Sequence, residues 1–213
     1  MRLLLIRHGQ TPANVLGLLD TARPGPGLTA LGERQATAVA EALRKQQIDG
    51  VFATTLVRTQ FTARPFAAAT VIEGLHEIEA GDLEGRSDRA SVRSYLNTAF
   101  AWGSGDLDVT MPGAMDGHAF FRRFDRGIAA VSHLDTAVVF SHGAAIRVWT
   151  AARATNVPPI FAGNHELDNT GVVELSGSPT EGWTLLSWAG APIGGPDLVD
   201  DSAHDPTGEV IGR

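Results

Sequence analysis

Short runs of apolar residues, flanked by charged or polar ones, mark the predicted strands of this chain. Each run is too short for a helix and lacks the alternation of a half-exposed strand, so it predicts a strand buried on both faces of a parallel sheet. Three such runs stand out: Leu3–Ile6, Val51–Ala53 and Ala137–Phe140. Val71–Ile72 could form a further short strand, and residues 171–175 and 183–188 predict a closing pair joined by a Gly-Ser-Pro turn.

Between these runs, apolar residues recur at the spacing of amphipathic helices. Thr29 follows a Pro-Gly loop and can cap a helix to about Gln46, because apolar residues recur there at i, i+3, i+4 and i+7. The same spacing predicts helices over residues 55–69, 116–134 and 144–153. Pro65 should stop or kink the first of them. Residues 75–112 have weaker periodicity and several glycines, so we expect loops and short helices there.

Strands that alternate with helices are typical of an α/β fold, and here they predict a three-layer αβα sandwich with a mostly parallel central sheet. The 213 residues, of which 43% are hydrophobic, suffice for one such domain. We expect this domain to cover residues 1–191. Residues 192–213 are rich in Gly, Pro and Asp and predict an extended or mobile C-terminal tail.

The charge balance narrows the choice of partners. With 17 Lys and Arg against 24 Asp and Glu, the formal net charge is −7, and no basic stripe is present that could neutralise the phosphates of a nucleic acid. A small phosphorylated metabolite is compatible with this balance, because a local arginine cluster can bind an anion within an acidic protein. The absence of cysteine excludes disulfides and thiolate chemistry.

The sequence shows no secretory signal and no apolar run near the ~20 residues of a membrane span. We therefore expect a cytoplasmic protein with no membrane partner. An exposed strand edge or helix face could pair two copies into a homodimer, although no motif indicates one.

Two histidines directly follow predicted strands. His8 comes after Leu3–Ile6 and His142 after Ala137–Phe140, and each is followed by a glycine. In an open α/β sheet ligands bind at the carboxyl ends of the strands, so adjacent parallel strands would bring both histidines to one edge. A single histidine is more often structural, but two at equivalent strand ends, each with an arginine nearby, favour a functional site.

Six segments carry a resemblance, and they occur in the order that one family shows. The segments are Leu5-Ile6-Arg7-His8-Gly9-Gln10-Thr11, Leu28–Ala36, Leu56–Ala63, Leu75–Gly85, Phe140–Gly143 and Asn169-Thr170. Together they resemble the motifs of the histidine phosphatase superfamily, the phosphoglycerate mutase-like proteins. The resemblance extends from residue 3 to about residue 175 and implies the fold of that family, which agrees with the fold predicted from periodicity.

The resemblance implies a catalytic role for five residues. His8 would attack phosphorus in line as a neutral imidazole and form a phosphohistidine. Arg7 and Arg58 match the arginines that bind the phosphoryl oxygens, and His142 matches the second histidine that donates to them. Glu77 matches the acid/base residue, which needs a raised pKa to protonate the leaving group. A backbone carbonyl near Gly9 is expected to fix the tautomer of the nucleophile.

Further residues are candidates for substrate binding. Asn14 could add a neutral donor, and Gly143 could let the backbone approach an anion closely. The loop that contains Thr21 and Arg23 departs from the family pattern, so these two residues could face the substrate in a way particular to this chain. The mechanism requires no metal and no cofactor.

Four alternatives are weighed against a phosphatase that uses a phosphohistidine. A phosphoglycerate mutase carries basic residues after its acid/base glutamate, whereas Glu79 stands here, so a phosphatase is favoured over a cofactor-dependent mutase. A non-catalytic binding protein of this fold would have lost a catalytic residue, and none is missing. Ser141 lacks the first glycine of the serine hydrolase motif G-x-S-x-G. A metallophosphatase would need clustered His and Asp ligands, and no H-E-x-x-H motif is present.

Overall fold

The structure, a computed structural model, describes residues 1–66, 68–200, 202–203 and 205–209. At its centre lies a six-stranded sheet in the order β3-β2-β4-β1-β5-β6. The strands are β1 (Arg2–Arg7), β2 (Gly50–Ala53), β3 (Thr70–Val71), β4 (Thr136–Ser141), β5 (Val172–Ser178) and β6 (Gly182–Ala189). The pairs β1–β4, β4–β2 and β2–β3 are parallel, and β5 runs antiparallel to both β1 and β6. The predicted sandwich with a mostly parallel sheet is confirmed.

The helices are α1 (Pro12–Val15), α2 (Ala30–Leu43), α3 (Val57–Ala63), α4 (Arg89–Gly103), α5 (Gly117–Val131), α6 (Gly143–Arg153), α7 (Phe161–Asn164) and the 3-10 turns η1 (Gly81–Leu83) and η2 (Pro196–Leu198). The four predicted helices are present as α2, α3, α5 and α6, and the structure adds further helices that were not predicted. Thr29 caps α2 as predicted, because its hydroxyl accepts the Gly32 N–H at 3.0 Å. The helix α3 ends at Ala63, ahead of Pro65.

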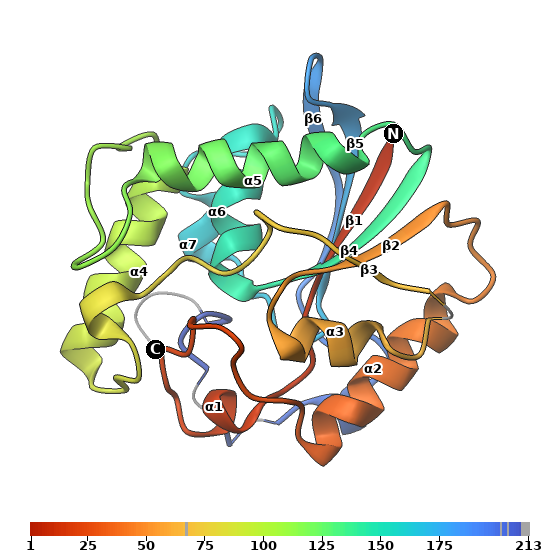
Figure 1. The fold of residues 1–213 in the computed structure, drawn as a ribbon, viewed down its shortest axis with the longest axis horizontal. Coiled ribbons are helices and arrows are strands. Elements are labelled where there is room, and N and C mark those ends of the chain that lie inside the picture. The colour runs from red at the N-terminus through yellow and green to blue at the C-terminus, as the bar shows by residue number, and fades with distance from the viewer. Residues whose placement is uncertain (67, 201, 204, 210–213) are drawn as a thin grey trace.

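The continuous apolar run of β1 reflects burial on both faces of the sheet. Leu4 and Ile6 pack with α2 and α3 in one cluster. Leu3 and Leu5 belong to a larger cluster on the other face, which is covered by α4, α5 and α6. Figure 1 shows these two groups of helices with the sheet between them. None of the helices in the described ranges has the length and apolarity needed to cross a membrane.

The prediction of loops and short helices over residues 75–112 is wrong for its second half. There α4 forms a helix as long as α5. Its buried residues do recur at helical spacing: Tyr95, Leu96, Ala99, Phe100 and Trp102. Asp88 caps its start by accepting the Ser91 N–H at 3.0 Å. The glycines that lowered the apparent periodicity lie at Gly85, Gly103 and Gly105, at the ends of the helix or outside it.

The described part of the segment 192–213 packs back onto the domain. Leu198 in η2 is buried, and its carbonyl accepts the Gln35 side-chain amide at 2.8 Å. Further on, the Gly208 carbonyl accepts the Leu167 N–H at 2.9 Å. These contacts, with those of Arg7 to Asp205 and Thr207, place residues 205–209 near the carboxyl ends of β1 and β4. The boundary at residue 191 and the mobility of the tail stay predictions.

Candidate active site

The two predicted histidines lie side by side. In the parallel pairing of β1 with β4, the last residues of the two strands, Arg7 and Ser141, lie opposite each other. The residue that follows each strand is a histidine. The His8 N–H donates to the Ser141 carbonyl at 3.0 Å, and the centroids of the two imidazole rings are 5.3 Å apart. The register of one strand pair therefore joins two parts of the chain that are far apart in sequence.

The hydrogen bonds of His8 fix its tautomer. Its Nδ1 lies 2.8 Å from the Gly9 carbonyl oxygen, and because a carbonyl only accepts, Nδ1 carries the proton. The lone pair is therefore on Nε2, which is the atom available for attack. Burial, helped by Arg58 and Arg7, holds the pKa of His8 well below its usual range, so the ring is neutral.

The backbone after His8 is held by residues of the matched motifs. The Gly9 N–H donates to the Thr62 hydroxyl at 2.9 Å, and the Gln10 N–H donates to Gln35 Oε1 at 2.8 Å. Gly32 lies so close that a Cβ there would be 2.2 Å from the Gln10 carbonyl oxygen. These residues of α2 and α3 thus hold the backbone that follows His8 in place.

Arg58 and His142 form one unit at the floor of the site. Arg58 Nε donates to His142 Nδ1 at 3.2 Å, and His142 Nε2 lies 2.9 Å from the Thr54 hydroxyl. Arg58 also donates to the Asp20 carbonyl at 2.9 Å and pairs with the Asp20 carboxylate at 3.3 Å. Burial and the neighbouring Arg58 lower the pKa of His142 well below its usual range. Both predicted residues are therefore at the site, with the histidine neutral.

The Glu77 carboxylate lies against the N-terminus of α6, the helix that begins directly after His142. Its carboxylate accepts N–H groups from Ala145 at 2.8 Å, Ile78 at 2.8 Å and Ala144 at 3.1 Å. Burial raises its pKa, although the three backbone N–H groups and Arg58 act in the opposite direction. A buried carboxyl with a raised pKa is suited to donate a proton at mildly acidic pH.

Arg123 of α5 holds the loop that carries Glu77. Its guanidinium donates to the carbonyls of Gly74 at 2.7 Å, His76 at 2.7 Å and Glu77 at 2.6 Å. The Tyr95 hydroxyl donates to the next carbonyl, that of Ile78, at 2.9 Å. The sequence analysis did not assign Arg123 to the site, because its hydrogen bonds go to backbone groups about 46 residues away.

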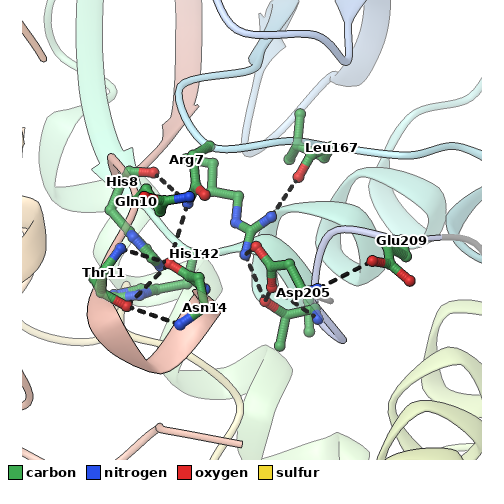
Figure 2. Close-up of polar contacts among 12 residues, drawn as sticks. Arg7, His8, Gln10, Thr11, Asn14, His142, Leu167, Asp205 and Glu209 are labelled. Carbon is green, nitrogen blue, oxygen red and sulfur yellow. Dashed lines mark hydrogen bonds and ion pairs between the residues drawn. The ribbon is translucent and has the colours of Figure 1, made fainter. Parts of the chain in front are cut away.

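The side chain of Arg7 is fully buried and points toward the C-terminal segment. Figure 2 shows its guanidinium between Leu167 and Asp205. It donates to the Leu167 carbonyl at 2.8 Å and to the Thr207 hydroxyl at 2.8 Å, and it pairs with the Asp205 carboxylate. Its Nε has no hydrogen-bond partner within the described chain. The sequence analysis missed Asp205 and Thr207, because no local pattern distinguishes them from the rest of the tail.

Three of the five residues predicted to be catalytic line a narrow pocket, whereas Arg7 and His142 are not among its lining residues. Its walls include His8, Asn14, Asp20, Arg58, Glu77 and Thr207. The amide oxygen of Asn14 accepts from the Thr11 N–H at 2.9 Å and from Asn169 Nδ2 at 3.3 Å, which orients its amide (Figure 2). Gly143 lies behind this wall, where a Cβ would be 2.6 Å from the Thr207 carbonyl oxygen and 3.0 Å from Arg7 Nε.

Thr21 and Arg23 line a different, wider pocket of about 580 Å³, together with His76 and Arg123. Thr21 donates its N–H and hydroxyl to the Glu84 carboxylate, and its hydroxyl accepts the Ala80 N–H at 2.9 Å. Arg23 Nη2 lies 3.1 Å from His76 Nδ1. The structure therefore does not bring these two residues to the walls of the catalytic pocket.

No group of three or more His, Cys, Asp or Glu side chains in the described part of the chain is arranged to hold a metal ion. The groups gathered at the carboxyl ends of β1 and β4 are neutral imidazoles, two arginines and a carboxyl group. This set can transfer a phosphoryl group without further ligands, because charge stabilisation by positioned donors is the main requirement of that reaction.

Comparisons with known proteins agree with this geometry. The sequence profile of the histidine phosphatase superfamily (branch 1) matches residues 3–190. The adenosylcobalamin/alpha-ribazole phosphatase of Escherichia coli is 36% identical over 151 residues, covering 67% of this chain and 73% of that protein. The solved mycobacterial glucosyl-3-phosphoglycerate phosphatase with VO3 has a TM-score of 0.72 at 26% identity, covering 89% of this chain and 99% of that one.

A further relative is much longer than this chain. The PE-PGRS family protein PE_PGRS11 of Mycobacterium tuberculosis is 40% identical over 212 residues, which cover 89% of this chain. The chain spans only 36% of the length of that relative.

Proposed function

Because this chain belongs to the histidine phosphatase superfamily (branch 1), we propose that it is an acid-type phosphomonoesterase that hydrolyses small phosphate monoesters through a phosphohistidine on His8. The observation that carries the proposal is the tautomer of His8, which leaves the Nε2 lone pair in a buried pocket beside Arg58 and Glu77. The lowered pKa of His8 and the raised pKa of Glu77 support activity at acidic pH.

In the first step, His8 Nε2 attacks phosphorus in line with the ester oxygen. The N–P bond forms as the P–O bond breaks, and the electron pair of that bond stays on the leaving oxygen. Glu77 in its protonated form supplies the proton that makes the leaving group a neutral alcohol. Arg58 and Arg7 stabilise the charge on the equatorial oxygens as positioned cations, and Arg7 does so from its Nε, which is unpaired in the described ranges.

In the second step, water attacks the phosphohistidine. The ionised Glu77 now accepts a proton from that water, the new O–P bond forms, and the N–P bond breaks to return neutral His8. The product is inorganic phosphate, and Glu77 is again protonated for the next cycle. One carboxyl group thus serves both steps.

Hydrolysis is favoured over transfer back to the substrate. A mutase must hold a doubly anionic intermediate, which needs a second set of cations. Here Arg123 is committed to backbone carbonyls and Arg23 faces His76 in the wider pocket. The named activities of the two relatives compared above are both phosphatase activities, which supports the same choice. A location in the cytoplasm and assembly into a homodimer stay predictions.

The test is a panel of small phosphate monoesters, including p-nitrophenyl phosphate and sugar, glycerate and amino-acid phosphates, compared by kcat/KM. We expect His8→Ala to lose at least about a thousandfold in kcat, because the covalent step is removed. His133→Ala, at an exposed histidine, is the matched control. Turnover that persists in His8→Ala would contradict the mechanism. Interconversion of 2- and 3-phosphoglycerate in a coupled enolase assay would favour the mutase, and no turnover with any ester would favour a binding protein.

A further inference from the structure

The C-terminal segment, residues 205–209, lies against the phosphate site. Asp205 pairs with Arg7 Nη2 (Figure 2). The Thr207 hydroxyl accepts from the same nitrogen at 2.8 Å. Thr207 also lines the catalytic pocket together with His8, Arg58 and Glu77. A segment about 200 residues away in sequence therefore touches both the arginine and the space that a phosphate would fill.

This segment is anchored in the folded domain. The Thr207 carbonyl accepts Arg147 Nη1 at 2.9 Å, and Arg147 is itself fully buried. The Gly208 carbonyl accepts the Leu167 N–H at 2.9 Å. Two glycines make the close approach possible, since a Cβ at Gly208 would be 2.1 Å from Arg7 Nη1 and one at Gly143 would be 2.6 Å from the Thr207 carbonyl oxygen.

The terminal nitrogens of the Arg7 guanidinium are hydrogen-bonded, whereas its Nε is not, within the residues that the structure describes. Asp205, Thr207 and Leu167 hold the two terminal nitrogens. A further donor of the guanidinium, Arg7 Nε, is buried without a partner among the described residues and lies beside Gly143, the residue after His142. A guanidinium held at both terminal nitrogens has a fixed orientation, and the Nε of Arg7 here lies beside the residue that follows His142, just beyond the carboxyl end of β4.

We propose that the C-terminal segment is part of the phosphate site, with Asp205 as a positioning residue that aims Arg7 Nε at the phosphoryl group and Thr207 as a wall that contacts the bound phosphate. This inference rests on the proposed function for the identity of the substrate. It adds two residues, outside the matched segments, to the site.

The opposite role would be inhibition, with the Asp205 carboxylate competing with phosphate for Arg7. The two roles predict opposite changes of phosphate affinity in Asp205→Asn. Removing a negative charge beside Arg7 strengthens the local positive potential, so charge alone would tighten phosphate binding. Losing the charge-assisted hydrogen bond that orients Arg7 would weaken phosphate binding. The positioning role requires that the second effect exceed the first.

The experiment measures equilibrium binding of inorganic phosphate by calorimetry, together with kcat and KM for an active ester. We expect Asp205→Asn and Thr207→Val each to weaken phosphate binding about tenfold and to raise KM. Asp205→Glu, which keeps the carboxylate, should recover part of the affinity. Asp197→Asn, at an exposed aspartate of the same tail, is the matched control and should leave both quantities unchanged.

Thermal unfolding of each variant identifies any that fail to fold, and a chain that ends at residue 203 provides a second variant. We expect this truncation to weaken phosphate binding as Asp205→Asn does. Unchanged or tighter binding in Asp205→Asn, or a more active truncated chain, would overturn the inference. Because phosphate binding is measured without turnover, weaker binding in Asp205→Asn supports the inference even if no ester proves to be a substrate.

Discussion

Arg58 Nε donates to His142 Nδ1 at 3.2 Å, so the second histidine presents a lone pair, and not a proton, toward the arginine beside it. A guanidinium is always a donor, which leaves the proton of the neutral ring on Nε2. This nitrogen lies 2.9 Å from the Thr54 hydroxyl oxygen. For His142 to donate to a phosphoryl oxygen as the family resemblance implies, its Nδ1 must first gain a proton. An incoming dianion supplies the reason, because it stabilises the imidazolium.

We therefore expect anion binding to be coupled to proton uptake. Sulfate is a suitable probe because it stays a dianion near neutral pH. Calorimetric titration at pH 7 in buffers of different ionisation enthalpy should show an uptake that approaches one proton per site. The uptake should disappear in His142→Gln and persist in His133→Gln. An unchanged uptake in the first variant would assign the proton to another group.

The activity should have an acidic pH window. Burial lowers the pKa of His8, so the nucleophile is neutral at every pH above that lowered value. Burial raises the pKa of Glu77, so the acid is protonated at every pH below that raised value. The reaction needs the neutral His8 and the protonated Glu77 together, so kcat/KM should be bell-shaped, with the acidic limb set by His8 and the alkaline limb set by Glu77. In Glu77→Gln this limb should vanish and the remaining rate should be low. An alkaline limb that survives in Glu77→Gln would show that another group supplies the proton.

The loss of kcat on replacing Arg123 should be larger for substrates whose leaving group needs a proton. Its three hydrogen bonds to the carbonyls of Gly74, His76 and Glu77 hold the acid in place. We expect Arg123→Met to lower kcat about a hundredfold for alkyl phosphates, the scale of general acid catalysis, but much less for p-nitrophenyl phosphate, whose leaving group is a weaker base. Arg122→Met, at the exposed neighbour, is the control. Equal losses for both substrates would point to a general structural effect.

Two glycines in helices should respond oppositely to alanine. At Gly143 a Cβ would be 2.6 Å from the Thr207 carbonyl oxygen, so Gly143→Ala must displace the C-terminal segment and should cost about 1–3 kcal/mol of unfolding free energy. At Gly103 the nearest atom would be 3.6 Å away, so Gly103→Ala should be neutral or stabilise by up to about 0.5–1 kcal/mol. Urea unfolding at pH 7 measures both. A neutral Gly143→Ala would mean that the segment moves freely.

The sequence by itself determined the central strands of the sheet and the positions of the two histidines that follow them. Leu3–Ile6 and Ala137–Phe140 are short apolar runs whose local pattern predicts buried strands, and they became β1 and β4. Parallel strands end at one edge, which is why the residues after them, His8 and His142, could be placed together without a structure. The one long helix that the sequence analysis missed, α4, also carries a helical pattern, but the glycines around it obscured its bounds.

Only the tertiary structure decided how the charged groups of the site are held. The pairing of Arg7 with Asp205 joins residues 198 positions apart, and the bonds of Arg123 reach carbonyls 46 or more positions back. Such contacts have no periodicity and no local motif, since the partners meet only after the sheet and helices have packed. The tautomers of His8 and His142 depend on the same packing, because each proton is placed by its neighbours' hydrogen bonds.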